Sequence, residues 1–280
     1  MTILVTGATG RVGRAVVTAL LRAGRPVRAL TRAPVTADLP EGVAVYQGDL
    51  EDPASLAAAL EGADLLYLFP VPSTAREVVA MAERAGVRRA VVLSGALADE
   101  ESADDEDGYG AVERAVQASG LDWTIVRPGE FAGNWLDYAP DVRARREVRR
   151  PFGNAVSRPT HEADVADVVA ASLLGEGHSG QVYTFGGPEA LTVAEQVRRI
   201  GAAIGAEVRF VELTPEQARM EWYDLDQGVD HDVIDWLLDM YGASVDGPET
   251  VPPSDTVERV TGSPPRDFAQ WAADHADDFR

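Results

Sequence analysis

The chain has 280 residues, 45% of them hydrophobic, which suffices for one large α/β domain or for a domain with a small appended lobe. Its net charge of −21 argues against nucleic acid or an anionic membrane as a partner, since both require clustered cations. It has no cysteine, which excludes disulfides and thiolate chemistry, and its 25 basic residues are all arginines, which excludes lysine Schiff bases and lysine proton relays.

The amino terminus and the hydropathy pattern indicate neither a signal peptide nor a membrane span, and with the absence of cysteine a cytoplasmic protein is expected. No stretch approaches the ~18 uninterrupted apolar residues of a membrane span. The start "MTILVTGATG" has neither a basic region nor a cleavage site, so no signal peptide is expected.

The first two-thirds of the chain alternates short apolar strands with amphipathic helices. Strands are expected at 2–6, 26–31, 43–50, 64–69, 89–95 and 122–129, and helices at 11–24, 52–62, 74–86 and 109–120. Because strands buried on both faces and separated by helices form parallel sheets, this rhythm predicts right-handed βαβ units.

Beyond residue 129 the alternation weakens. The stretch 130–155 is irregular and aromatic, a helix is expected at 160–174, a strand within 180–188, and a closing helix at 264–279. We therefore predict an α/β fold, a Rossmann-type doubly wound parallel sheet with a smaller C-terminal α+β substrate lobe. The predicted core spans 1–130, with 155–187 returning to it, and the predicted lobe spans 131–154 and 188–280.

The stretch "TGATGRVG" follows the first strand and opens the first helix. Gly7 allows a tight turn, Gly10 lets a pyrophosphate approach the backbone, and Gly13 permits close packing of helix on strand. The helix N-terminus offers N–H groups and a positive dipole end to phosphates. We expect the cofactor site to include Gly7, Thr9, Gly10, Arg11, Val12 and Gly13.

The end of the second strand selects between the two nicotinamide cofactors. Specificity for NADH requires an acid there to bind the ribose 2′-hydroxyl, but the sequence "ALTRAP" supplies Arg32 instead. An arginine can bind a 2′-phosphate and stack on adenine, and Arg11 is a second cation close by. These residues favour NADPH.

With these stretches, the chain resembles the NmrA-like branch of the atypical short-chain dehydrogenases. The likeness includes "TGATGRVGRAVVTALLRAG", "VRALTR", "AERAGVRRAVVLSG", "YGAVERAVQASGLDWTIVRPGEFAGN" and "THEADVADVVAASL", and it covers nearly the whole chain. The family contains NADPH-dependent quinone and dye reductases, and also dinucleotide-sensing regulators without turnover. The resemblance implies that Asp49 and Leu50 lie near the adenine, and Phe69 and Pro70 along the ribose–nicotinamide stretch.

The catalytic lysine of typical short-chain dehydrogenases is missing. Ser94 occupies the family's serine position and Tyr109 is the candidate tyrosine, but Glu113 then stands where lysine is expected. In another register Glu113 aligns with a downstream glutamate, Tyr109 takes the lysine position and Asp105 the tyrosine position. Because a nearby carboxylate raises the pKa of a phenol, Tyr109 would be a poor base beside Glu113, although it could donate a hydrogen bond to a developing oxyanion.

Other polar and aromatic stretches suggest further roles. Candidate substrate-binding residues are Phe131, Asn134, Trp135 and Trp222, although aromatic core packing explains the rings equally well. His161, Glu162 and Asp164 could be metal ligands, but acids in the first turn of a helix complement its dipole, and we expect no metal. The acidic run 99–107 predicts a solvated loop or a lid, and the basic cluster 143–150 is expected to pair internally.

These observations lead to one principal hypothesis and two alternatives. The principal hypothesis is an oxidoreductase that transfers hydride from NADPH to a conjugated small molecule, such as a quinone, an enone or an aromatic compound. Such an acceptor gives a delocalised anion, which needs little help from a strong acid. The alternatives are a dinucleotide-sensing regulatory protein, and a non-redox isomerase or cyclase on the same fold. A monomer or homodimer is expected.

Overall fold

The computed structural model describes residues 1–98, 108–224, 229–246 and 251–280. The acidic run 99–107, with Asp105, therefore lies outside the described residues. The chain forms two units, which are described separately. Unit 1 comprises Met1–Gly129, Glu162–Phe185 and Ser254–Pro265, and unit 2 comprises Glu130–His161, Gly186–Pro253 and Arg266–Arg280.

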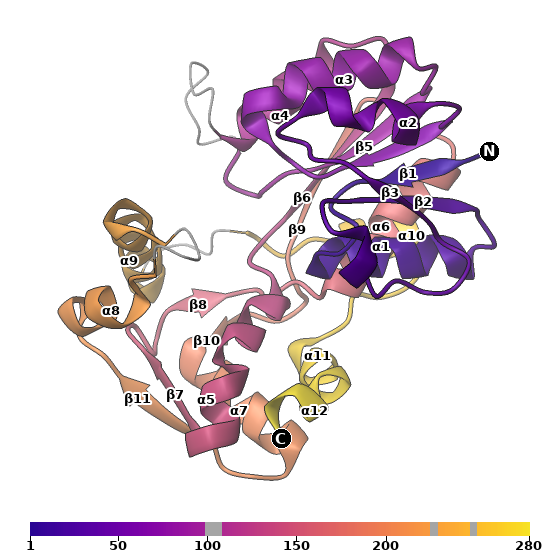
Figure 1. Ribbon diagram of the computed structural model, residues 1–280. Helices are drawn as coiled ribbons and strands as arrows, with labels where there is room; N and C mark the ends of the chain where they lie inside the picture. Colours follow the sequence, from indigo (N-terminus) through magenta and orange to yellow (C-terminus); the bar gives the residue numbers. More distant parts are fainter. Residues whose placement is uncertain (99–107, 225–228, 247–250) are drawn as a thin grey trace. The chain divides into compact units, whose positions relative to one another are not determined.

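Unit 1 is built around a seven-stranded parallel sheet (Figure 1). Its strands are β1 (Ile3–Val5), β2 (Val27–Thr31), β3 (Ala44–Gln47), β4 (Leu65–Leu68), β5 (Arg89–Leu93), β6 (Asp122–Pro128) and β9 (Gln181–Phe185). They lie in the order β3-β2-β1-β4-β5-β6-β9. The order reverses between β1 and β4, which is where open α/β sheets bind ligands. The predicted Rossmann-type fold is confirmed.

Helices cover both faces of this sheet. On one face α1 (Arg11–Arg22) packs on α6 (Glu162–Leu174), and on the other α3 (Ala75–Arg84) packs on α4 (Tyr109–Gln117) (Figure 1). Apolar side chains of the sheet and of the second helix layer form one buried cluster, which makes unit 1 a stable platform for its loops. The remaining short helices between the strands are η1 (Pro34–Thr36), η2 (Pro53–Leu56), α2 (Ala57–Leu60) and η3 (Pro72–Thr74).

A late segment returns to unit 1. The helix α10 (Thr256–Thr261) contacts α6 and β9, and its residues Thr256 and Val257 are buried. The sequence prediction assigned all of 188–280 to the smaller lobe. The difference arises because so short a helix gives little periodic signal, whereas its packing partners lie about 80 residues earlier in the chain.

Unit 2 combines short strands with helices. The stretch read as irregular contains η4 (Ala132–Tyr138), α5 (Ala139–Arg145) and β7 (Glu147–Arg150). The other elements are β8 (Val156–Ser157), β10 (Leu191–Thr192), α7 (Val193–Ile204), β11 (Arg209–Glu212), α8 (Pro215–Trp222), α9 (His231–Asp246), α11 (Phe268–Asp274) and α12 (Ala276–Phe279). Strand β7 pairs in parallel with β11, and β8 pairs antiparallel with β10. Trp135, Trp271 and Phe279 anchor the main apolar cluster.

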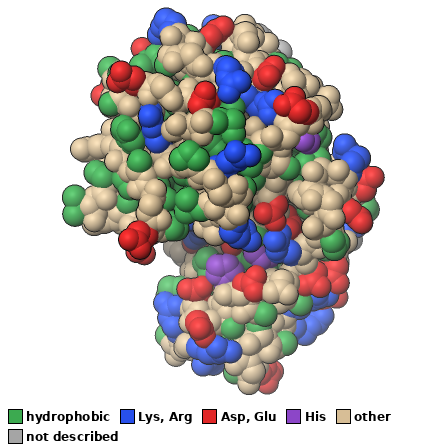
Figure 2. Space-filling model, turned by 90° about the vertical axis from the view of Figure 1, so that its right-hand side faces the viewer, with side chains coloured by type: hydrophobic (Ala, Val, Ile, Leu, Met, Phe, Trp, Pro, Cys, Tyr) green, Lys and Arg blue, Asp and Glu red, His purple; other side chains and the backbone are tan. Residues whose placement is uncertain are grey.

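The surface carries both signs of charge despite the large net negative charge. On the face shown in Figure 2, acidic and arginine side chains are interspersed. Local positive sites are therefore compatible with the acidic composition. Within the described ranges, no helix combines the length and apolar character needed to cross a bilayer.

Candidate functional site

The glycine turn between β1 and α1 can be built only with glycines at two positions. Gly7 has a φ of +58°, and a Cβ atom there would lie 3.0 Å from Cβ and Cγ of Phe69. A Cβ atom on Gly13 would lie 2.0 Å from the carbonyl oxygen of Gly7, which no packing can accept. At Gly10 the nearest atom to such a Cβ is 3.3 Å away, and the residue is exposed. The turn is thus tight on its inner side and accessible at Gly10.

Helix α1 begins in a way that suits an anion. Its N-cap is Gly10, without a capping side chain, and its first turn contains no acidic residue. The first N–H groups of a helix have no partner inside the helix, and the helix dipole adds a partial positive charge there. Phosphate groups could satisfy these donors, so the turn fits the pyrophosphate of a dinucleotide.

The second strand ends beside this turn. The hydroxyl oxygens of Thr9 and Thr31 are 3.5 Å apart, which brings the end of β2 to the glycine turn. Arg32 follows directly and is exposed, and among the described residues no side chain forms a hydrogen bond or ion pair with its guanidinium. No carboxylate follows β2 at this position. The site therefore presents a cation where the ribose 2′-position of a dinucleotide would lie.

The ends of β3 and β4 contribute apolar residues. Leu50 and Phe69 line one shallow surface depression, together with Leu68, Val71, Thr74, Ala75, Val78 and Val112. The Thr74 hydroxyl donates to the Leu50 carbonyl at 2.7 Å, which ties the start of α3 to the loop after β3. Phe69 and Leu50, both predicted to contact the cofactor, thus lie at one edge of unit 1, with the Phe69 ring against Gly7. Pro70 is next to Phe69 in the same loop.

Asp49 is partly engaged in its own turn. Its Oδ1 accepts the N–H of Glu51 at 3.1 Å, and its backbone N–H donates to the Ser55 hydroxyl at 2.8 Å. These bonds fix the loop after β3, in which Leu50 is 7% exposed. The role of Asp49 and Leu50 near an adenine stays a prediction.

A buried polar cluster lies behind the carboxyl ends of β5 and β6. Arg127, near the end of β6, donates from Nε to Oε1 of Glu113 at 2.7 Å and from Nη2 to Oε2 at 2.6 Å. The Ser94 hydroxyl, just after β5, donates to the same Oε1. Ser94, Glu113 and Arg127 are exposed by only 3%, 4% and 8%. A two-pronged ion pair of this kind compensates most of the cost of burying the two charges.

This cluster changes the interpretation of Glu113. The sequence reasoning placed its carboxylate beside the phenol of Tyr109, but both carboxylate oxygens are bonded to Arg127. Sequence reasoning missed Arg127, although an arginine within the apolar strand "DWTIVRPG" is a usable signal because a buried guanidinium requires an anionic partner. The Ser94 hydroxyl is also committed to Glu113, so its predicted catalytic role stays untested and its geometry favours a positioning role.

Of the two predicted catalytic residues, Ser94 and Tyr109, the tyrosine is the accessible one. It is the first residue of α4 and is 41% exposed. Its ring lies against Gly95, where a Cβ atom would be 2.9 Å from Cε2 of the tyrosine. The phenol is therefore held at the carboxyl end of β5, the edge of the sheet at which this fold class binds its ligands.

The predicted substrate residues lie in unit 2 in different environments. Trp135 is 2% exposed, and its indole N–H donates to Oε1 of Gln196 at 2.6 Å, so it forms part of the core. Trp222 packs beside the separate cluster of α8 and α9. Phe131 is partly buried, and Asn134 is exposed. The geometry of Trp135 favours core packing, and a role of the other three in substrate binding stays a prediction.

The remaining charged candidates take part in local interactions. His161 Nε2 lies 3.3 Å from Asp274 Oδ2, and Glu162 and Asp164 lie in the first turn of α6. In the described part of the chain, no group of three or more His, Asp or Glu side chains could hold a metal ion.

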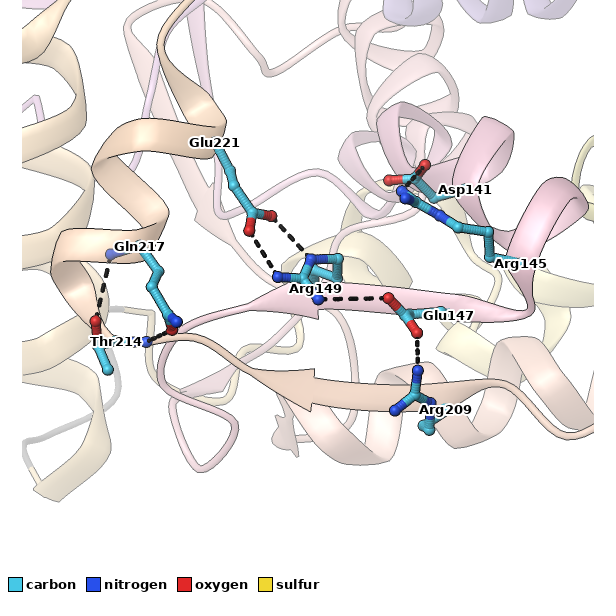
Figure 3. Close-up of polar contacts among 8 residues, drawn as sticks. All are labelled: Asp141, Arg145, Glu147, Arg149, Arg209, Thr214, Gln217 and Glu221. Carbon is cyan, nitrogen blue, oxygen red and sulfur yellow. Dashed lines mark hydrogen bonds and ion pairs between the residues drawn. The ribbon is translucent and has the colours of Figure 1, made fainter.

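The basic cluster 143–150 pairs internally, as predicted. Figure 3 shows Arg149 donating to both carboxylate oxygens of Glu221, at 3.0 and 2.7 Å, and lying 3.5 Å from Glu147. Glu147 also pairs with Arg209 from the neighbouring strand. Arg145 binds Asp141 at 2.6 Å, and the buried Arg150 lies 3.7 Å from Glu130.

Comparisons with known proteins identify the family of the chain. Residues 7–176 match a family model described as NAD(P)H-binding. The chain is 39% identical to a (4-alkanoyl-5-oxo-2,5-dihydrofuran-3-yl)methyl phosphate reductase of Streptomyces griseus, over 99% of both chains. It is 35% identical to an NAD(P)H azoreductase of Xenophilus azovorans, again over 99% of both. A structure of an Escherichia coli NADPH-dependent quinone oxidoreductase with NADPH superposes with a TM-score of 0.79, at 25% identity, covering 98% of this chain and 99% of the other.

Proposed function

Since the chain belongs to the NAD(P)H-binding family, in its NmrA-like atypical short-chain dehydrogenase branch, we propose that it is an NADPH-dependent reductase of conjugated small molecules. The resemblance inferred from the sequence is thereby confirmed at the level of the family. The two relatives by sequence reported above are named reductases, and the structural neighbour is named an NADPH-dependent quinone oxidoreductase.

The residues of unit 1 fit the cofactor. The uncapped start of α1 and the accessible Gly10 suit the pyrophosphate, and the exposed Arg32 suits the 2′-phosphate. Phe69, against Gly7, offers a flat apolar surface for the ribose–nicotinamide stretch. When bound, NADPH supplies the hydride. The absence of an acid after β2 is the feature that favours NADPH over NADH.

The observation that supports a conjugated acceptor is that Glu113 stands where typical short-chain dehydrogenases have their catalytic lysine. Glu113 is buried and bound by Arg127 and Ser94, so no side chain of α4 provides a cation to a reacting phenol from that position. Tyr109 can donate a hydrogen bond to an oxygen or nitrogen that gains negative charge, and water can deliver the final proton. A delocalised anion tolerates this weak assistance, whereas a simple alkoxide does not.

The named substrates of the relatives have the same electronic property. The Streptomyces griseus relative is named for an unsaturated lactone that bears an acyl group, the Xenophilus azovorans relative for azo compounds, and the Escherichia coli protein for quinones. In each, hydride addition gives an anion that spreads over several atoms. We propose an acceptor of this electronic class for the present chain.

The experiment is to follow NADPH oxidation with a matched panel: a quinone, an azo dye, an acyl butenolide and, as the control, a saturated ketone of similar size. We expect turnover with at least one conjugated compound and none with the ketone. Equal rates for the ketone and the conjugated compounds would contradict the argument from the missing catalytic lysine. Tight NADPH binding without oxidation of any compound would favour a dinucleotide sensor, and conversion without NADPH would favour a non-redox isomerase.

A further inference from the structure

Arg14 makes an unusual set of contacts for a helix residue. From α1 its Nε donates to the carbonyl of Thr9 at 3.0 Å, its Nη2 donates to the carbonyl of Ala37 at 2.7 Å, and its Nη1 donates to the carbonyl of Asp38. We propose that Arg14 is a positioning residue that sets the preference for NADPH by fixing the segment that carries Arg32. The inference rests on the proposed function, since it concerns the same cofactor site.

The segment in question, residues 32–38, is tied to the glycine turn at both ends. At its start, Thr31 accepts the N–H of Ala33 at 3.3 Å and lies next to Thr9. At its end, the guanidinium of Arg14 holds Ala37 and Asp38. Ala37 is 4% exposed, and Asp38 has a φ of +42°, in the left-handed region that aspartate adopts more often than most non-glycine residues. The bonds from Arg14 to the carbonyls of Ala37 and Asp38 help to hold this backbone in place.

The segment has little internal support. Its backbone bonds are long: Thr36 N–H to the Ala33 carbonyl at 3.3 Å and Ala37 N–H to the Pro34 carbonyl at 3.4 Å. The glycine turn, in contrast, holds itself together through Gly10 N–H to the Gly7 carbonyl at 3.0 Å and Arg14 N–H to the Gly10 carbonyl at 2.9 Å. Loss of the Arg14 side chain would therefore loosen the segment with Arg32 much more than the turn that binds the pyrophosphate.

This difference in support between the segment 32–38 and the glycine turn predicts that Arg14 affects the preference for NADPH over NADH. The pyrophosphate is common to NADPH and NADH, and the glycine turn that binds it would lose one bond, to the Thr9 carbonyl, but keep its own backbone bonds without the Arg14 side chain. The 2′-phosphate of NADPH needs Arg32 in place, so a loosened segment reduces affinity by the fraction of time that Arg32 is misplaced. Only arginine has the planar fork of donors that can bind carbonyls from two segments at once, and lysine would replace part of this function.

The test compares the full-length wild type with Arg14→Gln, Arg14→Lys, Arg32→Ala and, as a matched control on the same helix, Arg22→Gln, whose side chain is 61% exposed. Calorimetry measures binding of adenosine 2′,5′-bisphosphate and of 5′-AMP, which differ only in the 2′-phosphate. For Arg14→Gln we expect about tenfold weaker binding of the bisphosphate, with 5′-AMP changed by less than about threefold. Arg14→Lys should be intermediate, Arg22→Gln should match the wild type, and adding Arg14→Gln to Arg32→Ala should cause little further loss.

Equal weakening for both ligands, or none for either, would overturn the role of Arg14 while leaving the reductase proposal intact. If Arg14→Gln did not fold, the folded Arg14→Lys variant would decide the question, through the ratio of its affinities for the bisphosphate and for 5′-AMP. A wild type that did not prefer the bisphosphate over 5′-AMP would overturn both this inference and the proposed use of NADPH. Steady-state KM values for NADPH and NADH provide a second readout, because a misplaced segment should raise KM for NADPH and leave kcat at saturation nearly unchanged.

Discussion

Removal of Arg127 tests whether the buried cluster supports the position of Tyr109. Arg127→Met takes away two short bonds, of 2.7 and 2.6 Å, and leaves the Glu113 carboxylate with the Ser94 hydroxyl as its remaining cluster partner. Since Glu113 is only 4% exposed, water cannot easily replace the lost donors. Breaking a buried ion pair by removing one partner costs about 3–5 kcal/mol of unfolding free energy.

A double variant distinguishes the contribution of the ion pair to stability from the contributions of its two residues. In Glu113→Gln/Arg127→Met no buried charge remains in this cluster, so the expected cost is roughly half of that for Arg127→Met alone. Ser94→Ala removes one neutral donor and should cost about 1 kcal/mol. The exposed Arg84 on α3 provides the control, Arg84→Gln, for which we expect about 0.5 kcal/mol or less.

The assay is amide hydrogen exchange of the full chain, read from the peptide that contains α4. This local readout reports the free energy of opening at Tyr109–Gln117 without requiring the two units to unfold together. If Arg127→Met protected α4 as well as Arg84→Gln does, the cluster would not hold the helix. A double variant that cost the sum of its single substitutions would also refute the reasoning.

Three further predictions concern single residues. Gly13→Ala forces a Cβ atom against the Gly7 carbonyl and should abolish measurable NADPH binding, whereas Gly10→Ala, which has more room, should still bind; similar affinities would contradict the geometry of the turn. Tyr109→Phe should slow quinone reduction only modestly in steady-state assays, and a fall of several orders of magnitude would make the phenol an essential acid. Burial and the nearby Arg89 lower the pKa of His178 from 6.5, so the neutral form is favoured in the folded state. Its contribution to stability is therefore present above about pH 6.5 and is lost as the pH falls through the lowered pKa. In thermal unfolding the wild type should lose more stability than His178→Gln on moving from about pH 7 to about pH 5, and parallel losses would count against this linkage.

The sequence predicted the parts of the molecule that depend on local patterns. The strands from β1 to β6 and the glycine turn follow from apolar runs and glycine spacing, and the structure confirms the parallel sheet. The helix expected at 52–62 is instead the 3₁₀ helix η2, in which Pro53 and Leu56 are buried, followed by the short α2.

The parts that sequence reasoning missed depend on contacts distant in the chain. From the sequence, Glu113 is only the residue that stands in place of the expected lysine. The structure shows that its carboxylate is bound by Arg127, 14 positions away. Arg14 reads as an ordinary helix residue until the carbonyls of Ala37 and Asp38, more than 20 positions away, reach its guanidinium. No periodicity reports such pairings, because each partner is a polar residue or a backbone group without a pattern of its own.

The return of α10 to unit 1 limits how the chain can be divided into fragments. The chain passes from one unit to the other after residues 129, 161, 185, 253 and 265. No single cut therefore releases either unit as one continuous piece. A fragment that stops at residue 253 would uncover the surfaces of α6 and β9 that α10 contacts, and would lack α11 and α12 as well. Recombination that exchanges unit 2 between relatives must therefore transplant several segments together, which favours point substitution over exchange of whole segments as the way to vary this unit.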